Sequence, residues 1–365
     1  MQNKTLPRGD FRLGTLLRVT IMSVLALSLA LTCISCGTPD IKPEKIDLFW
    51  PLPPDEPKIR YIEAFQSNFD IGDVSGSFTR ELFGEERLVM LKKPYGVAVD
   101  RENRVYVTDI GRVFVFDKAN RKLSTIGDAP GMGKLKVPIG IAISQAGKVY
   151  VSDSVSDRVF VYDKNGKYLS SIGAGKDFEN PSGLAIDEKR QRIYIADSKL
   201  HNVQAFSLDG KRLLTIGKRG TGQGEFNFPT SIAVDSTGNL YVADTITARI
   251  QVFDPEGNYT RTIGELSDSP GNFVRPKGIG FDSEDHMYVV DTAFQNVQIF
   301  DKNGKLLLFF GAGGWSGPGL FMIPAGLTVD HEDRIYVVDQ LNKRVQIFQY
   351  LGEKWKRKQA GQPAQ

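Results

Sequence analysis

The chain has 365 residues, of which 41% are hydrophobic, 10% aromatic and 24% charged, enough to build a sizeable core. Both cysteines, Cys33 and Cys36, lie near the N-terminus, which excludes disulfides and thiol redox chemistry from the rest of the chain. The formal net charge is +3, and removal of residues 1–35 would leave 42 basic and 42 acidic residues. The basicity is therefore confined to the N-terminal segment, and it does not indicate nucleic-acid binding.

Residues 1–35 have the pattern of a secretory signal peptide. A basic segment precedes an apolar run from Ile21 to Leu31, and small residues follow that run. The run has roughly a dozen residues, whereas a membrane-spanning helix needs about 20. We therefore expect export, with an uncleaved signal anchor as the alternative.

The residues that end this segment resemble a lipobox, in which a signal peptidase cuts before a cysteine that then carries lipid. Cys36 is the expected site of lipidation, and Cys33 is the alternative, although it occupies a position where the motif prefers leucine. The resemblance implies a lipid anchor in a bacterial cell envelope, and Gly37 after the cysteine favours the outer membrane. Prolines are frequent in residues 36–57, so we expect a stiff, extended tether there.

Residues 59–65 alternate apolar and polar side chains, as a β-strand does. The C-terminal repeat ends at residues 345–348 without a convincing fourth strand of its own. We expect these two segments to pair, so that both ends of the chain share one sheet and no strand edge remains free.

A phrase of about a dozen residues recurs six times between these two segments. Each copy opens with a proline and continues to a tyrosine in a second apolar run, at steps of 43 to 48 residues. The opening prolines are Pro94, Pro138, Pro181, Pro229, Pro276 and Pro324, and the tyrosines are Tyr106, Tyr150, Tyr194, Tyr241, Tyr288 and Tyr336. A period of this size, made of short strands, predicts a radial array of four-stranded sheets.

The second copy shows how one unit is built. Strands are predicted at residues 140–143, 149–152, 158–163 and 168–172, with an Asn165-Gly166 hairpin turn before the last strand. The first strands are apolar on both sides, as sheets packed between two neighbours require, and small residues let them converge on the axis. The predicted fold is an all-β, six-bladed β-propeller over residues 58–351, with four antiparallel strands per blade.

The recurring runs of each copy, such as residues 138–143, 149–153 and 158–163 in the second copy, resemble the NHL repeat. The resemblance covers about residues 90–350. The resemblance implies a bacterial NHL-repeat lipoprotein with a six-bladed β-propeller. Related propellers include metal-dependent lyases and lactonases, which hold a cation near the axis with His, Glu, Asp or Asn from several blades. An enzyme of this kind is the alternative that the resemblance leaves open.

The titratable residues do not favour that alternative. His201, His286 and His331 occupy different positions in their repeats, so they are not expected to converge on one metal ion. Aspartates end every second strand and five of the six first strands, and we expect them to accept hydrogen bonds at loop corners. They are Asp109, Asp153, Asp197, Asp244, Asp291 and Asp339 on the second strands, and Asp100, Asp187, Asp235, Asp282 and Asp330 on the first.

The copies differ most in the loops between second and third strands and in the connectors between blades, which form one face of the propeller, here called the loop face. We expect this face to bind a protein or glycan partner, because apolar residues that do not belong to the repeat lie on it. The candidate binding residues are Tyr95, Lys277, His201, Phe294, Trp315 and Leu341. A purely architectural role in a surface complex is a further alternative.

Residues 352–365 form a basic, polar tail that we expect to be solvated, with contact to an anionic membrane surface as the alternative. We expect no cofactor and no bound metal. The partner is expected to come from the cell envelope, and the protein is expected to be monomeric.

Overall fold

The computed structural model describes residues 47–72, 88–173, 175 and 177–361. The chain divides into two units, Met1–Ile46 and Asp47–Gln365, and the described residues all belong to the second. The predicted signal peptide, Cys36 and the first half of the predicted tether therefore lie outside the described residues. Within the described part, no helix is both long and apolar enough to span a membrane.

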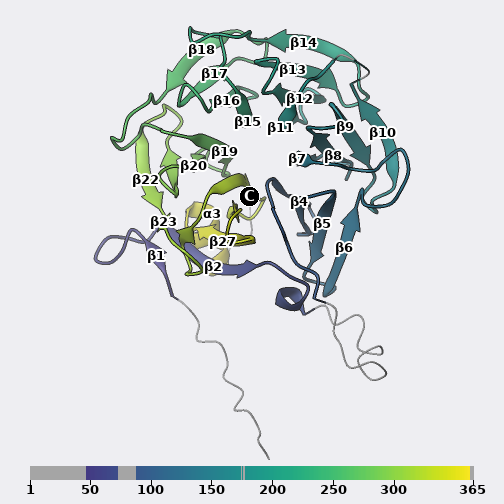
Figure 1. The fold of residues 1–365 in the computed structure, drawn as a ribbon. Helices are drawn as coiled ribbons and strands as arrows, with labels where there is room; N and C mark the ends of the chain where they lie inside the picture. The colour runs from purple at the N-terminus through teal and green to yellow at the C-terminus, as the bar shows by residue number, and fades with distance from the viewer. Residues whose placement is uncertain (1–46, 73–87, 174, 176, 362–365) are drawn as a thin grey trace, which may run out of the picture. The chain divides into compact units, whose positions relative to one another are not determined.

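Six antiparallel sheets surround a central axis and confirm the predicted propeller (Figure 1). Blade one comprises β3 (Val97–Val99), β4 (Val105–Asp109), β5 (Arg112–Asp117) and β6 (Lys122–Ile126). Blade two comprises β7 (Pro138–Ile143), β8 (Val149–Asp153), β9 (Arg158–Tyr162) and β10 (Tyr168–Ile172). Blade three comprises β11 (Pro181–Asp187), β12 (Arg192–Asp197), β13 (Asn202–Ser207) and β14 (Arg212–Ile216). Blades four and five comprise β15 (Pro229–Val234), β16 (Leu240–Asp244), β17 (Arg249–Phe253) and β18 (Tyr259–Ile263); and β19 (Pro276–Phe281), β20 (Met287–Asp291), β21 (Asn296–Phe300) and β22 (Leu306–Phe310).

Blade six joins the two ends of the described chain. It contains β25 (Pro324–Val329), β26 (Arg334–Asp339) and β27 (Arg344–Tyr350), and β2 (Ile59–Phe65) supplies its fourth strand. The register places Tyr61 opposite Phe348 and Phe65 opposite Val345, so the predicted closure is confirmed. A short parallel pair, β23 (Ala312–Gly313) and β24 (Leu320–Phe321), connects blades five and six, and the turn η1 (Phe69–Ile71) follows β2.

The hairpin turns explain why the strands end where they do. In blade two, Gly166 has φ 85°, and its amide donates to the Asp163 carbonyl at 3.0 Å. The Asp163 carboxylate accepts the amides of Asn165 and Lys167, both at 2.9 Å. The chain therefore reverses between β9 and β10 as the Asn-Gly pair predicts.

Neighbouring blades bury their faces against each other in six apolar clusters, one at each interface. A fully buried Val, Ile or Leu stabilises the folded state by roughly 1.5–3 kcal/mol, so these clusters hold the ring without disulfides. Small residues bring the first strands together, as predicted: a Cβ on Gly140 would lie 2.1 Å from the Ser182 carbonyl oxygen, and one on Gly326 would lie 2.4 Å from the Tyr95 carbonyl oxygen.

The sheet begins earlier than the predicted tether boundary at residue 57. Phe49 and Trp50 form β1 (Phe49–Trp50), which pairs with β2 and adds a fifth strand to blade six. The Trp50 ring lies 5.7 Å from that of Phe310 and 5.8 Å from that of Phe348. Aromatic burial therefore draws part of a proline-rich segment into the propeller.

The basic tail also differs from the expectation, because it forms α3 (Glu353–Gln359). The Glu353 amide donates to Glu284 at 2.9 Å, Lys356 lies 3.1 Å from Glu56, and Lys358 pairs with Glu332. These acids lie in turns between first and second strands or in the segment before β2. The side of the propeller opposite the loop face is here called the turn face. The basic side chains of α3 therefore pair with acidic side chains on the turn face.

The closing strand offers a matched test, because Ile59 is fully buried and Ile62 is 43% exposed on the same strand. Ile59→Ala should lower the free energy of unfolding by about 2–5 kcal/mol, because it removes buried methyl groups at the closure. Ile62→Ala should change it by no more than about 0.5 kcal/mol. Urea unfolding followed by circular dichroism measures both values, and equal effects of the two substitutions would contradict the observed closure.

Candidate functional site

A buried carboxylate fixes the backbone of the loop face in each blade. In blade two, Asp153 is fully buried at the end of β8. It accepts the amides of Lys136 and Val137 in the preceding connector at 2.6 and 3.0 Å. It also accepts the amides of Val155 and Ser156 in its own loop at 3.1 and 2.9 Å. One side chain therefore holds both backbone segments that form this part of the face.

The other five second-strand aspartates hold the connector in the same way. The donors are the amides of Lys92 and Lys93 to Asp109, Glu179 and Asn180 to Asp197, Asn227 to Asp244, Val274 and Arg275 to Asp291, and Met322 to Asp339. The Asp244 carboxylate accepts fewer backbone amides than that of Asp153. Burial raises the pKa of Asp244, although the Arg249 guanidinium, 3.5 Å away, acts in the opposite direction. The predicted role of these aspartates as hydrogen-bond acceptors is confirmed.

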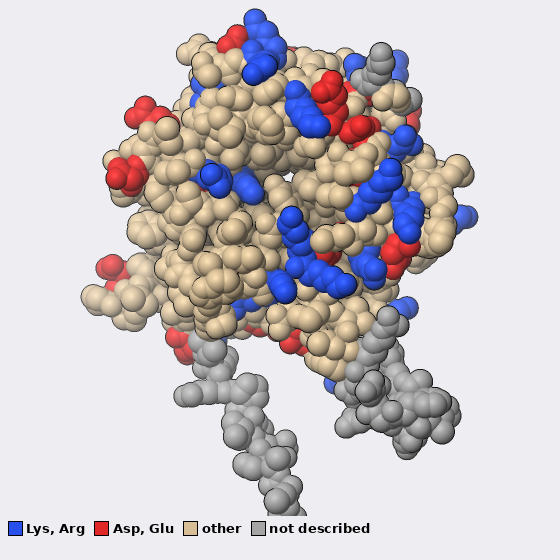
Figure 2. Space-filling model, viewed as in Figure 1, with Lys and Arg blue, Asp and Glu red and all other residues tan. Residues whose placement is uncertain are grey.

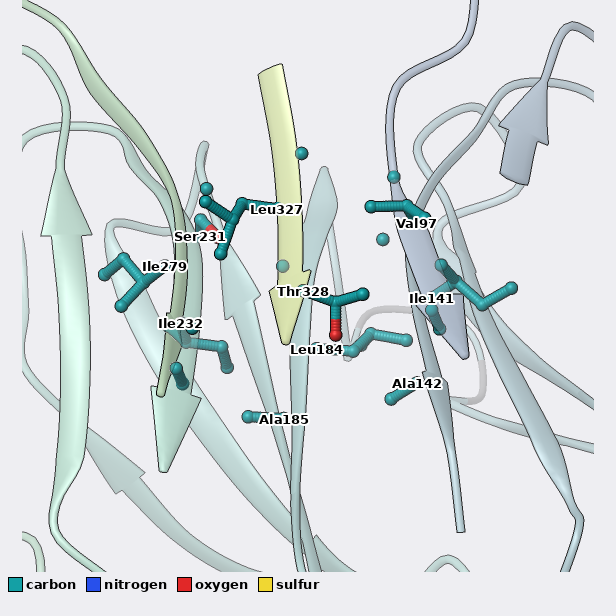
Figure 3. A pocket seen from close by; sticks show the side chains of 18 of the residues that line it. Val97, Ile141, Ala142, Leu184, Ala185, Ser231, Ile232, Ile279, Leu327 and Thr328 are labelled. Carbon is teal, nitrogen blue, oxygen red and sulfur yellow. The ribbon is translucent and has the colours of Figure 1, made fainter. Parts of the chain in front are cut away.

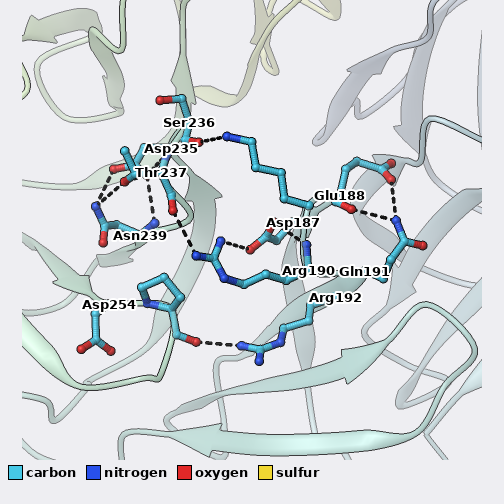
Figure 4. A network of polar contacts seen from close by, with 12 residues as sticks. Asp187, Glu188, Arg190, Gln191, Arg192, Asp235, Ser236, Thr237, Asn239 and Asp254 are labelled. Carbon is cyan, nitrogen blue, oxygen red and sulfur yellow. Dashed lines mark hydrogen bonds and ion pairs between the residues drawn. The ribbon is translucent and has the colours of Figure 1, made fainter.

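The aspartates at the ends of the first strands accept hydrogen bonds in the turns of the turn face. Asp100 accepts Arg104 Nε at 2.7 Å and the Tyr106 hydroxyl at 3.1 Å. Between blades three and four, Arg190 donates to Asp187 at 3.0 Å and to the Thr237 carbonyl at 3.3 Å (Figure 4). These carboxylates thus tie turns together within a blade and, through arginine, between blades.

Each loop between second and third strands carries an apolar residue shortly after its buried aspartate. These six residues, here called the apolar ring, are Ile110, Val155, Leu200, Ile246, Phe294 and Leu341. Ile246 is 60% exposed and Leu341 is 42% exposed, whereas Leu200 and Phe294 are half-buried. Phe294 and Leu341 therefore belong to a feature that every blade repeats, which an alignment on the aspartates could have revealed.

Trp315 lies in the connector between β23 and β24 and is 64% exposed. The backbone on either side is held by blade six: Asn342 donates to the Gly314 carbonyl at 3.2 Å, and Arg344 donates to the Ser316 carbonyl at 2.7 Å. The indole is therefore presented to solvent from an anchored loop.

His201 has a structural position. Its Nδ1 accepts the Phe228 amide at 3.3 Å, and its ring meets the Phe228 ring edge-on at 5.6 Å, which links blade three to the connector before blade four. His286 lies on the turn face, 2.9 Å from Asp282, and that hydrogen bond raises its pKa. The described residues contain no group of three or more His, Cys, Asp or Glu side chains placed to hold a metal ion.

Basic side chains surround the mouth of the channel on the loop face. They are the exposed residues Lys92, Lys93, Lys136, Lys199, Arg275 and Lys343. Figure 2 shows one face of the molecule on which Lys and Arg side chains gather around the central opening. Such a field attracts acidic partners and raises their association rate.

The first strands of all six blades enclose a central channel of about 350 Å³ (Figure 3). Its wall is made mostly of Val, Ile, Leu, Ala and Gly, with hydroxyl groups from Tyr95, Thr230, Ser231 and Thr328. No His, Asp, Glu, Asn or Cys is among the described residues that line it. The lining therefore lacks the donors with which related propellers hold a cation on the axis, and it does not fit such a metal.

Two predicted site residues meet at the loop-face mouth of this channel. Lys277 Nζ lies 5.2 Å from the centroid of the Tyr95 ring, above the small, buried Ala325. Burial lowers the pKa of Lys277, with a further contribution from Arg275, and burial raises the pKa of Tyr95 to about 12. His201, Phe294, Trp315 and Leu341 lie elsewhere on the loop face, so the six predicted residues do not form one cluster.

Two family models match different parts of the chain. The model described as SMP-30/Gluconolactonase/LRE-like region matches residues 84–265, and a model described as 6-bladed beta-propeller matches residues 281–359. Both matches fall on the sheets described above. The chain is a six-bladed β-propeller.

Solved structures are similar to this propeller at low sequence identity. A Bacteroides thetaiotaomicron protein of unknown function has TM-score 0.57 and 19% identity over 71% of this chain and 70% of that one. An auxiliary nutrient binding protein from the same organism has TM-score 0.56 and 16% identity over 71% of this chain and 69% of that one. A virginiamycin B lyase from Staphylococcus aureus has TM-score 0.54 and 14% identity over 80% of this chain and 99% of that one. At these identities the similarity shows the propeller fold alone.

The half-buried Lys277 ammonium should cost stability, so Lys277→Met should raise the melting temperature at pH 7. Below its lowered pKa, Lys277 is charged in the folded and unfolded states, and its burial is unfavourable. Above its ordinary pKa it is neutral in both states, so the advantage of Met should shrink as the pH rises between 7 and 10.

Lys136→Met is the control, because Lys136 is exposed and the substitution should leave the melting temperature nearly unchanged at every pH. Scanning calorimetry measures both variants across this pH range. A lower melting temperature for Lys277→Met at pH 7 would show that the ammonium stabilises the fold.

Proposed function

We propose that this propeller is a non-catalytic binding module whose loop face docks a protein or glycan partner. The observation that carries the proposal is the apolar ring with Trp315, exposed on loops whose backbone is held by buried aspartates and by Arg344. Aromatic and aliphatic side chains on a fixed backbone lose little conformational freedom on binding, so they are favourable contact residues.

Charge narrows the class of partner. The exposed cations near the channel mouth, including Lys92, Lys136 and Lys343, lie on the same face as the apolar contacts. Complementary charge increases the association rate and suppresses wrong partners. The best match is a partner surface that combines acidic groups with apolar contacts.

We also propose that lipidated Cys36 anchors the protein in a bacterial envelope, at the outer membrane. The first strand, β1, begins at Phe49, which leaves the twelve residues 37–48 between the lipidated cysteine and the sheet. Twelve extended residues span at most about 43 Å, so this tether would hold the propeller close to the bilayer. Mass spectrometry of the mature protein tests the modification: a lipid mass on Cys36 supports it, and an unmodified or uncleaved N-terminus contradicts it.

A metal-dependent lyase or lactonase is the competing function. Its support is the family match over residues 84–265 and the similarity to a lyase fold. The channel lining offers no donor set for the metal, so we propose binding without such chemistry. Elemental analysis of the purified protein separates the two: stoichiometric Zn or Ca would favour the enzyme.

The docking proposal predicts that Trp315→Ala combined with Leu341→Ala will reduce capture of the envelope partner at least tenfold. Each substitution removes exposed apolar area from the loop face without disturbing the core. The measurement is affinity capture from envelope extracts, with the captured protein or glycan identified by mass spectrometry and its Kd then measured with purified components.

Leu169→Ala combined with Leu307→Ala is the matched control. Leu169 on β10 and Leu307 on β22 are 45% and 50% exposed, but they lie on the outermost strands of their blades. The control should retain full binding. Equal loss in both double variants, or no loss in either, would count against docking through the loop face.

A further inference from the structure

We propose that the central channel binds a small organic monoanion, a monocarboxylate with an apolar chain, whose carboxylate lies at Lys277 and Tyr95 and whose chain runs along the channel wall. The juxtaposition that carries this inference is one ammonium group at the mouth of a channel whose other lining side chains are mostly aliphatic, with hydroxyl groups from Tyr95, Thr230, Ser231 and Thr328. This site is separate from the docking contacts of the apolar ring and Trp315, and it does not depend on them.

The polar end of the site is defined by the Lys277 ammonium and the Tyr95 hydroxyl, which contact each other through the tyrosine ring but have no ion-pair or hydrogen-bond partner among the described residues. Lys277 is the one charged residue among the described residues that line the channel. Among the described residues, no carboxylate lies within ion-pair distance of its Nζ, and no hydrogen bond joins the Tyr95 hydroxyl to another side chain or to the backbone. A half-buried ammonium without a counter-ion is unfavourable, so an anion at this position would recover interactions that the described residues do not supply.

The wall suits an apolar chain. Ile141, Leu184, Ile232, Ile279 and Leu327 surround the interior, and Gly and Ala occupy many of the remaining positions (Figure 3). The volume of about 350 Å³ lies within the range of small-molecule sites. The lining extends along β3 and the residues before it from Tyr95 to Val99, about 13 Å at the usual rise of a strand.

The two mouths differ in charge, which sets the orientation. At the turn-face end the lining residues are all apolar: Val99, Ile143, Ile186, Val234, Phe281 and Val329. Aspartates follow five of these six directly, and their carboxylates are already bonded within their own turns. A carboxylate is therefore repelled at that mouth and favoured at Lys277, while a chain of about eight carbons fills the apolar interior.

The test uses sodium octanoate as the probe and isothermal titration calorimetry on the mature protein at pH 7. Octanoate should bind with one site per chain, whereas acetate, which lacks the chain, and octylamine, which reverses the charge, should each bind at least tenfold more weakly. Lys277→Met should weaken octanoate binding at least tenfold, and Lys277→Arg should keep it within about threefold because it restores the positive charge.

Two results would overturn the proposal. One is the absence of octanoate binding to the wild-type protein, and the other is equal binding to wild type and Lys277→Met. Circular dichroism verifies that each variant is folded. Leu169→Ala, on the outermost strand of blade two, serves as the control outside the channel, and its octanoate affinity should be unchanged. Partner capture is measured in a separate experiment. A negative octanoate result would therefore overturn the channel site without contradicting the proposed docking at the loop face.

Discussion

The buried carboxylate at the end of each second strand is the interaction on which the loop face depends. Asp153 accepts four backbone amides, two from the connector before its blade and two from the loop after its strand. Without this acceptor those amides would need other partners, and buried amides without partners are costly. Because backbone atoms make these contacts, the neighbouring side chains are free to differ from blade to blade. The same constraint thus explains both the regularity of the fold and the variety of its face.

The two faces of the ring have different electrostatic character. On the turn face, carboxylates such as Asp187 are bonded within their turns, arginines reach the next blade, and α3 adds basic side chains that meet Glu332 and Glu56. On the loop face, exposed cations and apolar side chains surround the channel mouth. The proposed binding therefore uses the loop face, and the channel, with Lys277 at its entrance, opens onto the same face.

The repeat made the fold predictable, because proline, tyrosine and aspartate return at fixed places in every blade. The strands of blade two begin and end within two residues of their predicted bounds, and residues 59–65 close blade six as their alternation indicated. Phe49 and Trp50 escaped prediction because prolines surround them and the pairing depends on rings from blades five and six. The helix α3 was missed for a similar reason, since a seven-residue helix depends on partners such as Glu284 that are distant in sequence.

The site was predictable only in part. The repeat pattern placed Tyr95 and Lys277 on the loop face, but their contact at the channel mouth arises from ring closure, which periodicity alone does not specify. The apolar ring was obscured because its members follow the buried aspartate by one, two or three positions, as at Ile110, Val155 and Phe294. Trp315 shows the opposite case, because a residue that breaks the repeat stands out from the sequence pattern alone.

The organisation of the loop face depends most directly on the buried aspartates, and hydrogen exchange tests their role. In Asp153→Ala, followed by mass spectrometry at pH 7, the amides of residues 136–137 and 155–156 should exchange at least tenfold faster while the strands of blade two keep their protection. The control Asp163→Ala, which removes an exposed hairpin acceptor, should affect only residues 164–167. Unchanged exchange in residues 136–137 and 155–156 of Asp153→Ala would contradict the claim that buried carboxylates organise this face.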